Sequence, residues 1–322
     1  MRDHQGIRKN ELIAGTLRFL KEIQRVKRIL IRCLFMLLVA TCAAQVQRKA
    51  APHSNKMRQS CVRVRDGAFH SAALDREMKY RILLPCGYQT DGGRFPVLYL
   101  LHGLYGDYLN WDTRTDLERY AERYELIVAM PDADDSWYTN SATDPKDKFE
   151  EYIARDLVAE IDGKLRTLRS RHARAIAGLS MGGYGALKIA LRYPEDFAFA
   201  GSLSGALDAP QGLGDKRPEF RDQLLKVFGP PGSAVRADNN VFSLLQSATT
   251  NNLPYFYLAC GSADDFLQIN RDFTAQLSSR GAAYEYHETA GGHAWDYWGR
   301  SVPGLLRAAA AVISDQRRRI SE

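Results

Sequence analysis

Short apolar runs rich in β-branched and aromatic residues alternate along this chain with longer segments of helical periodicity. Turn-forming residues bound the runs, which predict buried strands at 96–101, 126–130, 173–178, 197–203, 254–260 and 284–287. Two intervening segments place apolar side chains on one helical face, the first with Phe149, Tyr152, Ile153, Leu157, Ile161, Leu165 and Leu168, the second with Phe266, Ile269, Phe273 and Leu277. This alternation predicts an α/β fold with a mostly parallel central sheet and helices on both faces.

Two regions depart from that alternation. Strand-like runs at 61–65 and 78–84 come first, and the polar segment between them suits an antiparallel N-terminal pair. Later, the segment 208–252 is rich in Gly and Pro around a short helical stretch at 219–228. We expect this segment to be a cap or loop over the sheet, which either shapes a pocket or forms an inert surface.

The formal net charge of +6 is concentrated at the N-terminus. Residues 1–44 carry nine basic and three acidic residues, so the rest of the chain is formally neutral, which argues against a nucleic-acid partner. A length of 322 residues with 45% hydrophobic content suits one catalytic domain plus a leader. We expect the domain at 61–315, after a linker at 45–60 and before a basic tail at 316–322.

Residues 1–44 have the layout of an export signal, with basic residues ahead of the apolar stretch 33–40 and small residues at Ala43 and Ala44. The apolar stretch is shorter than the roughly 20 residues of a membrane span. The pattern therefore predicts an exported protein, periplasmic or extracellular, without a stable membrane span. Because residues 1–25 make an unusually long preamble, we expect the true start near Val26. Lipidation at Cys42 is disfavoured, since Thr41 is a bulky neighbour for a lipidated Cys.

Beyond the leader the cysteines are Cys61, Cys86 and Cys260. Export to an oxidising compartment would permit one disulfide, and Cys61 and Cys86 flank the predicted hairpin. Three ordinary buried thiols are the equally favoured alternative.

The run Gly178-Leu179-Ser180-Met181-Gly182 matches the pattern Gly-x-Ser-x-Gly. It follows a predicted strand and precedes a helical run at 184–190, which is the strand–turn–helix setting of a nucleophile elbow. So tight a turn needs glycines where backbone passes close by. We predict that Ser180 is a nucleophile; an idle serine in a glycine-rich turn is the alternative.

A serine hydroxyl needs a base to remove its proton and an acid to orient that base, and on this fold the acid precedes the histidine along the chain. Asp264 and His293 each follow the end of a predicted strand, where α/β sheets gather their sites. His293 is preferred to His287, which lies within a strand. Asp264 is preferred to Asp265, although either aspartate is suited to cap the helix that follows.

An oxyanion formed during acyl transfer needs backbone N–H donors. Met181, directly after the serine, and Leu104, in the loop after an early strand, are the predicted donors. His102 precedes that loop and has no second metal ligand at a sensible spacing, so we predict no metal site and expect His102 to brace the loop.

These residues resemble the esterase D branch of the α/β-hydrolases, which includes feruloyl esterases, S-formylglutathione hydrolases, short-chain acyl esterases and mycolyltransferases. The resemblance extends from about Cys61 to the last helix. It is carried by Leu101-His102-Gly103, Gly106 with Trp111, Met130-Pro131-Asp132, Ser136-Trp137-Tyr138-Thr139-Asn140, Gly178 to Ala186, Cys260-Gly261 with Asp264, and Gly291-Gly292-His293 with Trp295 and Trp298.

The resemblance implies an α/β-hydrolase fold and a Ser180, Asp264 and His293 triad that hydrolyses esters through an acyl-enzyme without a cofactor. The doubled aspartate at 264 and 265 departs from the family pattern. In such proteins Trp137 and Tyr138 would lie beside the site and line a pocket, and ordinary loop packing is the alternative.

The leading hypothesis is an exported serine carboxylesterase acting on small-molecule substrates, short acyl or carbohydrate-linked esters. An acyltransferase of the mycolyltransferase type, in which a sugar hydroxyl replaces water, is an alternative. S-formylglutathione hydrolysis is disfavoured by the export leader, and a non-catalytic binding protein by the complete set of catalytic residues. The sequence makes no prediction of oligomeric state.

Overall fold

The computed structural model describes residues 60–321. The predicted leader at 1–44, its cleavage site, the start near Val26 and Cys42 lie outside the described residues, as does the linker apart from Ser60.

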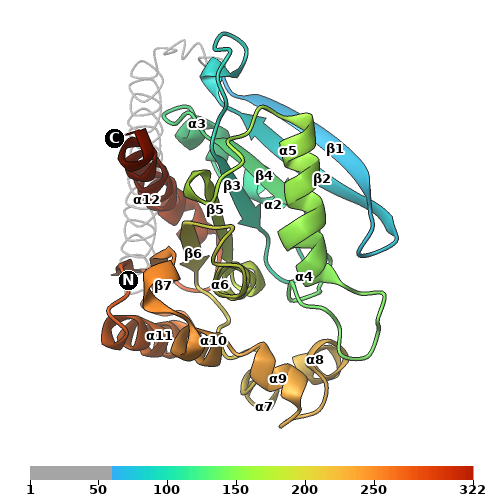
Figure 1. Ribbon diagram of the computed structural model, residues 1–322. Coiled ribbons are helices and arrows are strands. Elements are labelled where there is room, and N and C mark those ends of the chain that lie inside the picture. Colours follow the sequence, from blue (N-terminus) through green and yellow to red (C-terminus); the bar gives the residue numbers. More distant parts are fainter. Residues whose placement is uncertain (1–59, 322) are drawn as a thin grey trace, which may run out of the picture. The chain divides into compact units, whose positions relative to one another are not determined.

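An eight-stranded sheet in the order β1-β2-β4-β3-β5-β6-β7-β8 forms the centre of the domain (Figure 1). The N-terminal strands β1 (Arg63–Ser71) and β2 (Arg76–Leu84) are antiparallel, and β2 is also antiparallel to β4 (Ile127–Pro131). All further neighbours are parallel, through β3 (Val97–Leu101), β5 (Arg174–Leu179), β6 (Phe199–Leu203), β7 (Tyr255–Gly261) and β8 (Tyr284–Thr289). The predicted fold class is confirmed.

Helices cover both faces of the sheet, with α5 and α12 on opposite sides (Figure 1). One face packs on a continuous helical segment, α4 (Phe149–Glu151), a π-helical turn (Tyr152–Leu157) and α5 (Val158–Lys164), and on α6 (Met181–Arg192) and α11 (Leu267–Ser279). The other face packs on α2 (Asn110–Arg114), α3 (Leu117–Ala121) and α12 (Trp295–Ser321). Every residue of β3 to β6 is buried, which explains their uninterrupted apolar runs.

The helix predicted to include Leu165 and Leu168 ends earlier, at Lys164. The backbone N–H of Phe95 donates to the carbonyl of Arg166 at 2.8 Å, and the N–H of Leu168 donates to the carbonyl of Phe95 at 2.8 Å. These bonds draw the chain alongside the segment before β3 and end the helix. Leu168 therefore packs on the opposite face of the sheet from the helix to which the sequence assigned it.

The segment 208–252 holds four short helices where the sequence predicted one, α7 (Leu213–Lys216), α8 (Arg221–Phe228), α9 (Ala234–Asp238) and α10 (Val241–Ser247). This segment also contains single 3-10 turns at Pro218–Phe220 and Thr250–Asn252. Outside it, 3-10 turns occur at Cys86–Tyr88 (η1) and Arg171–Ala173. The side chains of Leu224, Phe228, Val241 and Leu245 join the core on the α6 face. We call this segment the cap, and it is anchored to the domain.

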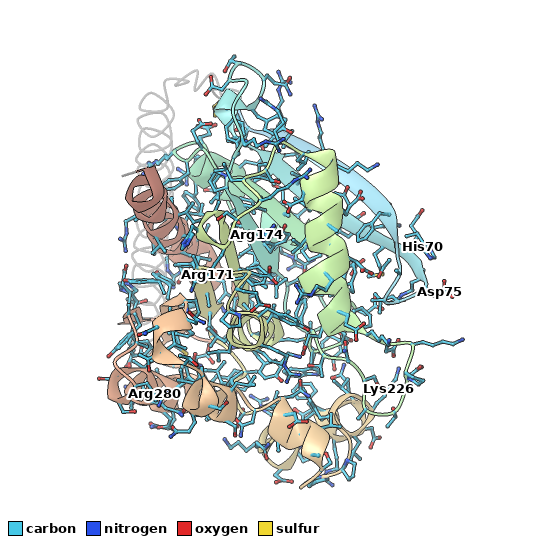
Figure 2. The ribbon with its side chains drawn as sticks, in the orientation of Figure 1. His70, Asp75, Arg171, Arg174, Lys226 and Arg280 are labelled. Carbon is cyan, nitrogen blue, oxygen red and sulfur yellow. A yellow bond between two sulfur atoms is a disulfide. The ribbon has the colours of Figure 1, made fainter. Side chains whose placement is uncertain are left out.

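At the start of β5, arginine side chains connect the amino edge of the sheet to the neighbouring segments. Arg171 and Arg174 lie near each other there (Figure 2). Arg174 pairs with Asp162 of α5 at 2.6 Å, and Arg171 donates to the carbonyl of Pro194 at 2.6 Å. The buried hydroxyl of Thr167 also bonds to Asp162, at 2.5 Å. This edge is opposite the one at which β5 delivers Ser180.

A disulfide lies near the N-terminal end of the domain, and a long helix forms its C-terminal end. A disulfide joins Cys61 and Cys86 across the N-terminal hairpin, while Cys260 is a buried free thiol in β7. Helix α12 continues to Ser321, through the segment that the sequence suggested as a tail. Within residues 60–321, no helix is both long and apolar enough to cross a membrane.

Candidate active site

Ser180 occupies a sharp turn between β5 and α6, with φ 53° and ψ −116°. A non-glycine residue in such a conformation costs about 1–3 kcal/mol and is typical of functional sites. Both motif glycines are required by close backbone contacts. A Cβ on Gly178 would lie 2.4 Å from the carbonyl carbon of Gly182, and one on Gly182 would lie 2.5 Å from the carbonyl oxygen of His102. The run therefore has the strand–turn–helix geometry of a nucleophile elbow.

The structure brings His293 and Asp264 to Ser180. His293 Nε2 lies 2.9 Å from Ser180 Oγ, and His293 Nδ1 lies 3.1 Å from Asp264 Oδ2. Asp264 follows β7, and His293 follows β8. The Asp264 side chain is fully buried, whereas His293 is 31% exposed. The three groups form one hydrogen-bonded chain from a buried carboxylate to a hydroxyl that lines a pocket.

Asp264 also caps the helix that follows, a role for which the sequence suited either Asp264 or Asp265. Its Oδ1 accepts the backbone N–H of Phe266 at 2.9 Å, at the start of α11. Asp265 instead is exposed and pairs with Arg217 of the cap. Burial raises the pKa of Asp264, but its bonds to His293 and Phe266 outweigh burial and hold that pKa below the usual range. The carboxylate is ionised at neutral pH.

Two aromatic rings and one serine support the Asp264–His293 pair. Phe266 and Trp298 meet the His293 ring edge-on, with centroids 5.0 and 4.9 Å away. Trp298 Nε1 donates to Ser204 Oγ at 3.1 Å, and the Ser204 hydroxyl helps to lower the pKa of Asp264. No motif in the sequence marks Ser204, and its positive φ of 50° is visible only in the structure.

The two predicted oxyanion donors flank Ser180. Met181 is the first residue of α6, so helical hydrogen bonding leaves its N–H free. Leu104 lies in the loop after β3 and lines the same pocket as Ser180. Gly103 brings this loop close, since a Cβ there would lie 3.5 Å from Ser180 Cβ. Leu104 and Met181 stay the predicted oxyanion donors.

His102 braces that loop, as the sequence suggested. Its Nε2 accepts the N–H of Ala133 at 3.0 Å, so its Nδ1 carries the proton and donates to the carbonyl of Gly103 at 2.8 Å. Burial lowers the pKa of His102, which keeps the ring neutral. Across residues 60–321, no cluster of three or more His, Cys, Asp or Glu side chains is arranged to hold a metal ion.

Ser180 and His293 open into a pocket of about 510 Å³. Its walls are rich in aromatic side chains, Trp137, Phe220, Phe266, Trp295 and Trp298, with the 76% exposed Tyr105 beside them. Such a pocket suits a small, largely apolar group held next to the serine.

Of the two residues predicted to line a pocket, the structure brings only Trp137 to it. Tyr138 is completely buried behind the wall, which corrects that prediction. Its ring packs directly on Gly185, since a Cβ there would lie only 2.5 Å from Tyr138 Cδ2. Its hydroxyl donates to the carbonyl of His102 at 2.9 Å. Both residues have positive φ angles, 55° and 51°.

The chain is similar in sequence to known esterases. The esterase family model described as "Putative esterase" matches residues 71–309. An acetyl esterase of Caldicellulosiruptor saccharolyticus is 30% identical over 230 residues, 69% of this chain and 86% of the relative. Esterase Rv1288 of Mycobacterium tuberculosis is 32% identical over 282 residues, 77% of this chain and 60% of the relative.

Among solved structures, the fluorophosphonate-binding serine hydrolase FphF of Staphylococcus aureus aligns with a TM-score of 0.69 and 26% identity, covering 78% of this chain and 98% of FphF. The family match spans most of the domain and includes the elbow and both partners of Ser180. The chain therefore belongs to the esterase family of α/β-hydrolases and is a serine hydrolase of the carboxylesterase type.

Proposed function

We propose that this protein is an exported esterase that hydrolyses short acyl or carbohydrate-linked esters through an acyl-enzyme on Ser180. The observation that carries the proposal is the hydrogen-bonded chain from Asp264 through His293 to Ser180, which opens into an aromatic pocket.

In the first half-reaction, Ser180 Oγ attacks the ester carbonyl carbon while His293 Nε2 takes the hydroxyl proton. The resulting oxyanion accepts hydrogen bonds from the N–H groups of Leu104 and Met181. The intermediate collapses, the bond to the alcohol breaks, and His293 returns the proton to the leaving oxygen. Asp264 holds the histidine tautomer and stabilises the imidazolium.

In the second half-reaction, water takes the place of the alcohol. His293 removes a proton from the water as its oxygen attacks the acyl carbon, and the proton then passes to Ser180 as the acid leaves. Every proton and bond is accounted for by residues of this chain and one water molecule, so the proposed reaction needs no cofactor.

The substrate class is supported by the size of the pocket and by the likeness to an acetyl esterase. A pocket of about 510 Å³ must hold parts of both the acyl group and the alcohol, which favours a short acyl group. The exposed ring of Tyr105 on the pocket wall is suited to stack on a sugar ring.

Export is supported by two features. The charge and hydropathy pattern of residues 1–44 is that of an export leader, and the Cys61–Cys86 disulfide suits an oxidising compartment. Cell fractionation with N-terminal sequencing of the mature protein tests this part. Recovery of the uncut chain in the cytosol would contradict it.

Product analysis tests the activity itself. With 4-nitrophenyl acetate, the full chain should release acetate and nitrophenol, and Ser180→Ala should lose this activity. The same assay with a sugar as acceptor separates hydrolysis from transfer. Predominant formation of the acylated sugar would replace the proposal with an acyltransferase.

A further inference from the structure

Two consecutive bulky residues, Trp137 in the pocket wall and Tyr138 directly behind it, have positive φ angles. Bulky residues rarely adopt positive φ, so the surrounding structure must hold the loop in this conformation. The indole of Trp137 is only 2% exposed and forms part of the pocket. The contacts that hold the backbone at Trp137 and Tyr138 therefore also determine the shape of the pocket wall that Trp137 forms.

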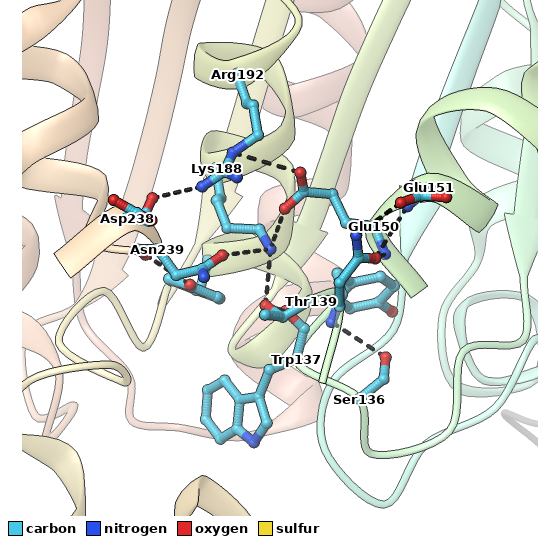
Figure 3. A network of polar contacts seen from close by, with 12 residues as sticks. Ser136, Trp137, Thr139, Glu150, Glu151, Lys188, Arg192, Asp238 and Asn239 are labelled. Carbon is cyan, nitrogen blue, oxygen red and sulfur yellow. Dashed lines mark hydrogen bonds and ion pairs between the residues drawn. The ribbon is translucent and has the colours of Figure 1, made fainter. Parts of the chain in front are cut away.

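The next residue, Thr139, connects the strained loop to the helix that follows Ser180. Its hydroxyl donates to the carbonyl of Trp137 at 2.8 Å and accepts from Lys188 Nζ at 2.7 Å (Figure 3). Lys188 lies on α6, two turns after Ser180, and is fully buried. One hydroxyl thus links the backbone of the wall to the nucleophile helix.

Lys188 is also bound from two other sides. Its Nζ lies 2.7 Å from Glu150 Oε2, on α4, and 3.2 Å from Asn239 Oδ1, at the end of α9 in the cap (Figure 3). Burial lowers the pKa of Lys188 to about 8, and the charge of Glu150 opposes that change. The ammonium group is charged at neutral pH and holds the loop, α4 and the cap against α6.

The Trp137 wall is built from other rings than those that meet His293. Trp137 packs edge-on against Tyr184 of α6 and at an angle against Phe228 of α8, with centroids 6.1 and 6.2 Å away. The rings that contact His293 are different ones. Because the departing alcohol must remain near His293 to receive its proton, the part of the pocket bounded by Trp137 is left for the acyl group.

We infer that Lys188 is a specificity-determining positioning residue, which through Thr139 fixes the Trp137 wall and limits the pocket to short acyl groups. The inference rests on the proposed esterase function and adds the residues that set its acyl selectivity. A released wall allows Trp137 to shift and admits longer acyl chains, while Ser180 and His293 keep their contacts.

Three variants of the full chain test this inference. Thr139→Val removes the hydroxyl and keeps the shape of the side chain, and Thr139→Ser keeps the hydroxyl that Lys188 requires. Thr167→Val is the matched control, because Thr167 is equally buried and its hydroxyl is bonded to Asp162 at 2.5 Å, at the amino edge of the sheet.

The measurement is kcat/KM for the 4-nitrophenyl esters of acetate, butyrate and octanoate. Thr139→Val should lower the ratio of acetate to octanoate activity about tenfold. Thr139→Ser and Thr167→Val should keep the wild-type ratio. An unchanged ratio in Thr139→Val, or an equal change in Thr167→Val, would overturn the inference.

Fluorophosphonate labelling of the same samples separates this inference from the function on which it rests. If wild-type Ser180 is labelled and the ratios do not change, only the role of Lys188 is refuted. If wild-type Ser180 is not labelled, the proposed function itself is refuted.

Discussion

The indole N–H of Trp298 donates to the hydroxyl of Ser204 at 3.1 Å. The same indole meets the His293 ring at 90°, with centroids 4.9 Å apart. The Ser204 hydroxyl in turn helps to keep Asp264 ionised. Trp298 therefore supports His293 directly and Asp264 through Ser204.

We predict that Trp298→Phe lowers kcat about tenfold on a short ester, because it removes the indole N–H that acts through Ser204 and Asp264. Any change in KM reports the smaller ring in the pocket wall. Ser204→Ala should have a similar effect. If the two residues act in one chain, the double variant is no slower than the slower single variant. Effects that multiply in a double-mutant cycle would show that they act independently.

The adjacent aspartates should differ sharply in their effect on rate. Asp264→Asn keeps an oxygen for the N–H of Phe266 but no longer holds the required tautomer of His293, so kcat should fall about 10⁴-fold. Asp265→Asn changes an exposed carboxylate and should retain most of kcat. Steady-state kinetics with thermal unfolding as a folding control checks both. Equal losses would show that the triad assignment is wrong.

The buried ion pair between Lys188 and Glu150 should be important for stability. Lys188→Met leaves Glu150 buried without its 2.7 Å partner and should lower the free energy of unfolding by about 3–5 kcal/mol. Arg192, with its Nε 3.4 Å from Glu150 Oε1, compensates the remaining charge only in part, so adding Glu150→Gln should recover a large part of that loss. Urea denaturation of the three proteins measures this, and a double variant as unstable as Lys188→Met would contradict it.

Stability should fall in acid partly because of Asp264 and Glu150. Burial raises the pKa of Glu150, but the charges of Lys188 and Arg192 outweigh burial, so its pKa is lowered, as is that of Asp264. Groups with lowered pKa values stabilise the fold above their unfolded pKa values of about 3.9 and 4.3 and lose that contribution as pH falls through the folded values. Asp264→Asn should therefore lose less stability than wild type between pH 6 and pH 3. Parallel curves would exclude the contribution of Asp264.

Much of the fold could be predicted from the sequence, because strands buried on both faces leave continuous apolar runs. The end of the helix at Lys164 could not, since Leu165 and Leu168 continue the helical periodicity. That end depends on hydrogen bonds between the chain around Arg166 and Phe95, about 70 residues away. Local pattern carries no information on such pairing.

The candidate site shows the same division. Ser180, Asp264 and His293 could be located because each follows a strand of a parallel sheet, and such ends converge on one edge. Trp137 and Tyr138 are neighbours in sequence, yet only the backbone conformation determines that one lines the pocket and the other is buried. Lys188 carried no signal, because lysine in a helix is usually exposed.

The proposed reaction depends on Ser180 as the activated nucleophile. Its most direct test is to treat the full chain with a fluorophosphonate probe and locate the adduct by peptide mass spectrometry. We expect one labelled serine, Ser180, with labelling abolished in Ser180→Ala and strongly slowed in His293→Ala. A wild-type protein that is not labelled, or a Ser180→Ala variant labelled to the same extent, would contradict it.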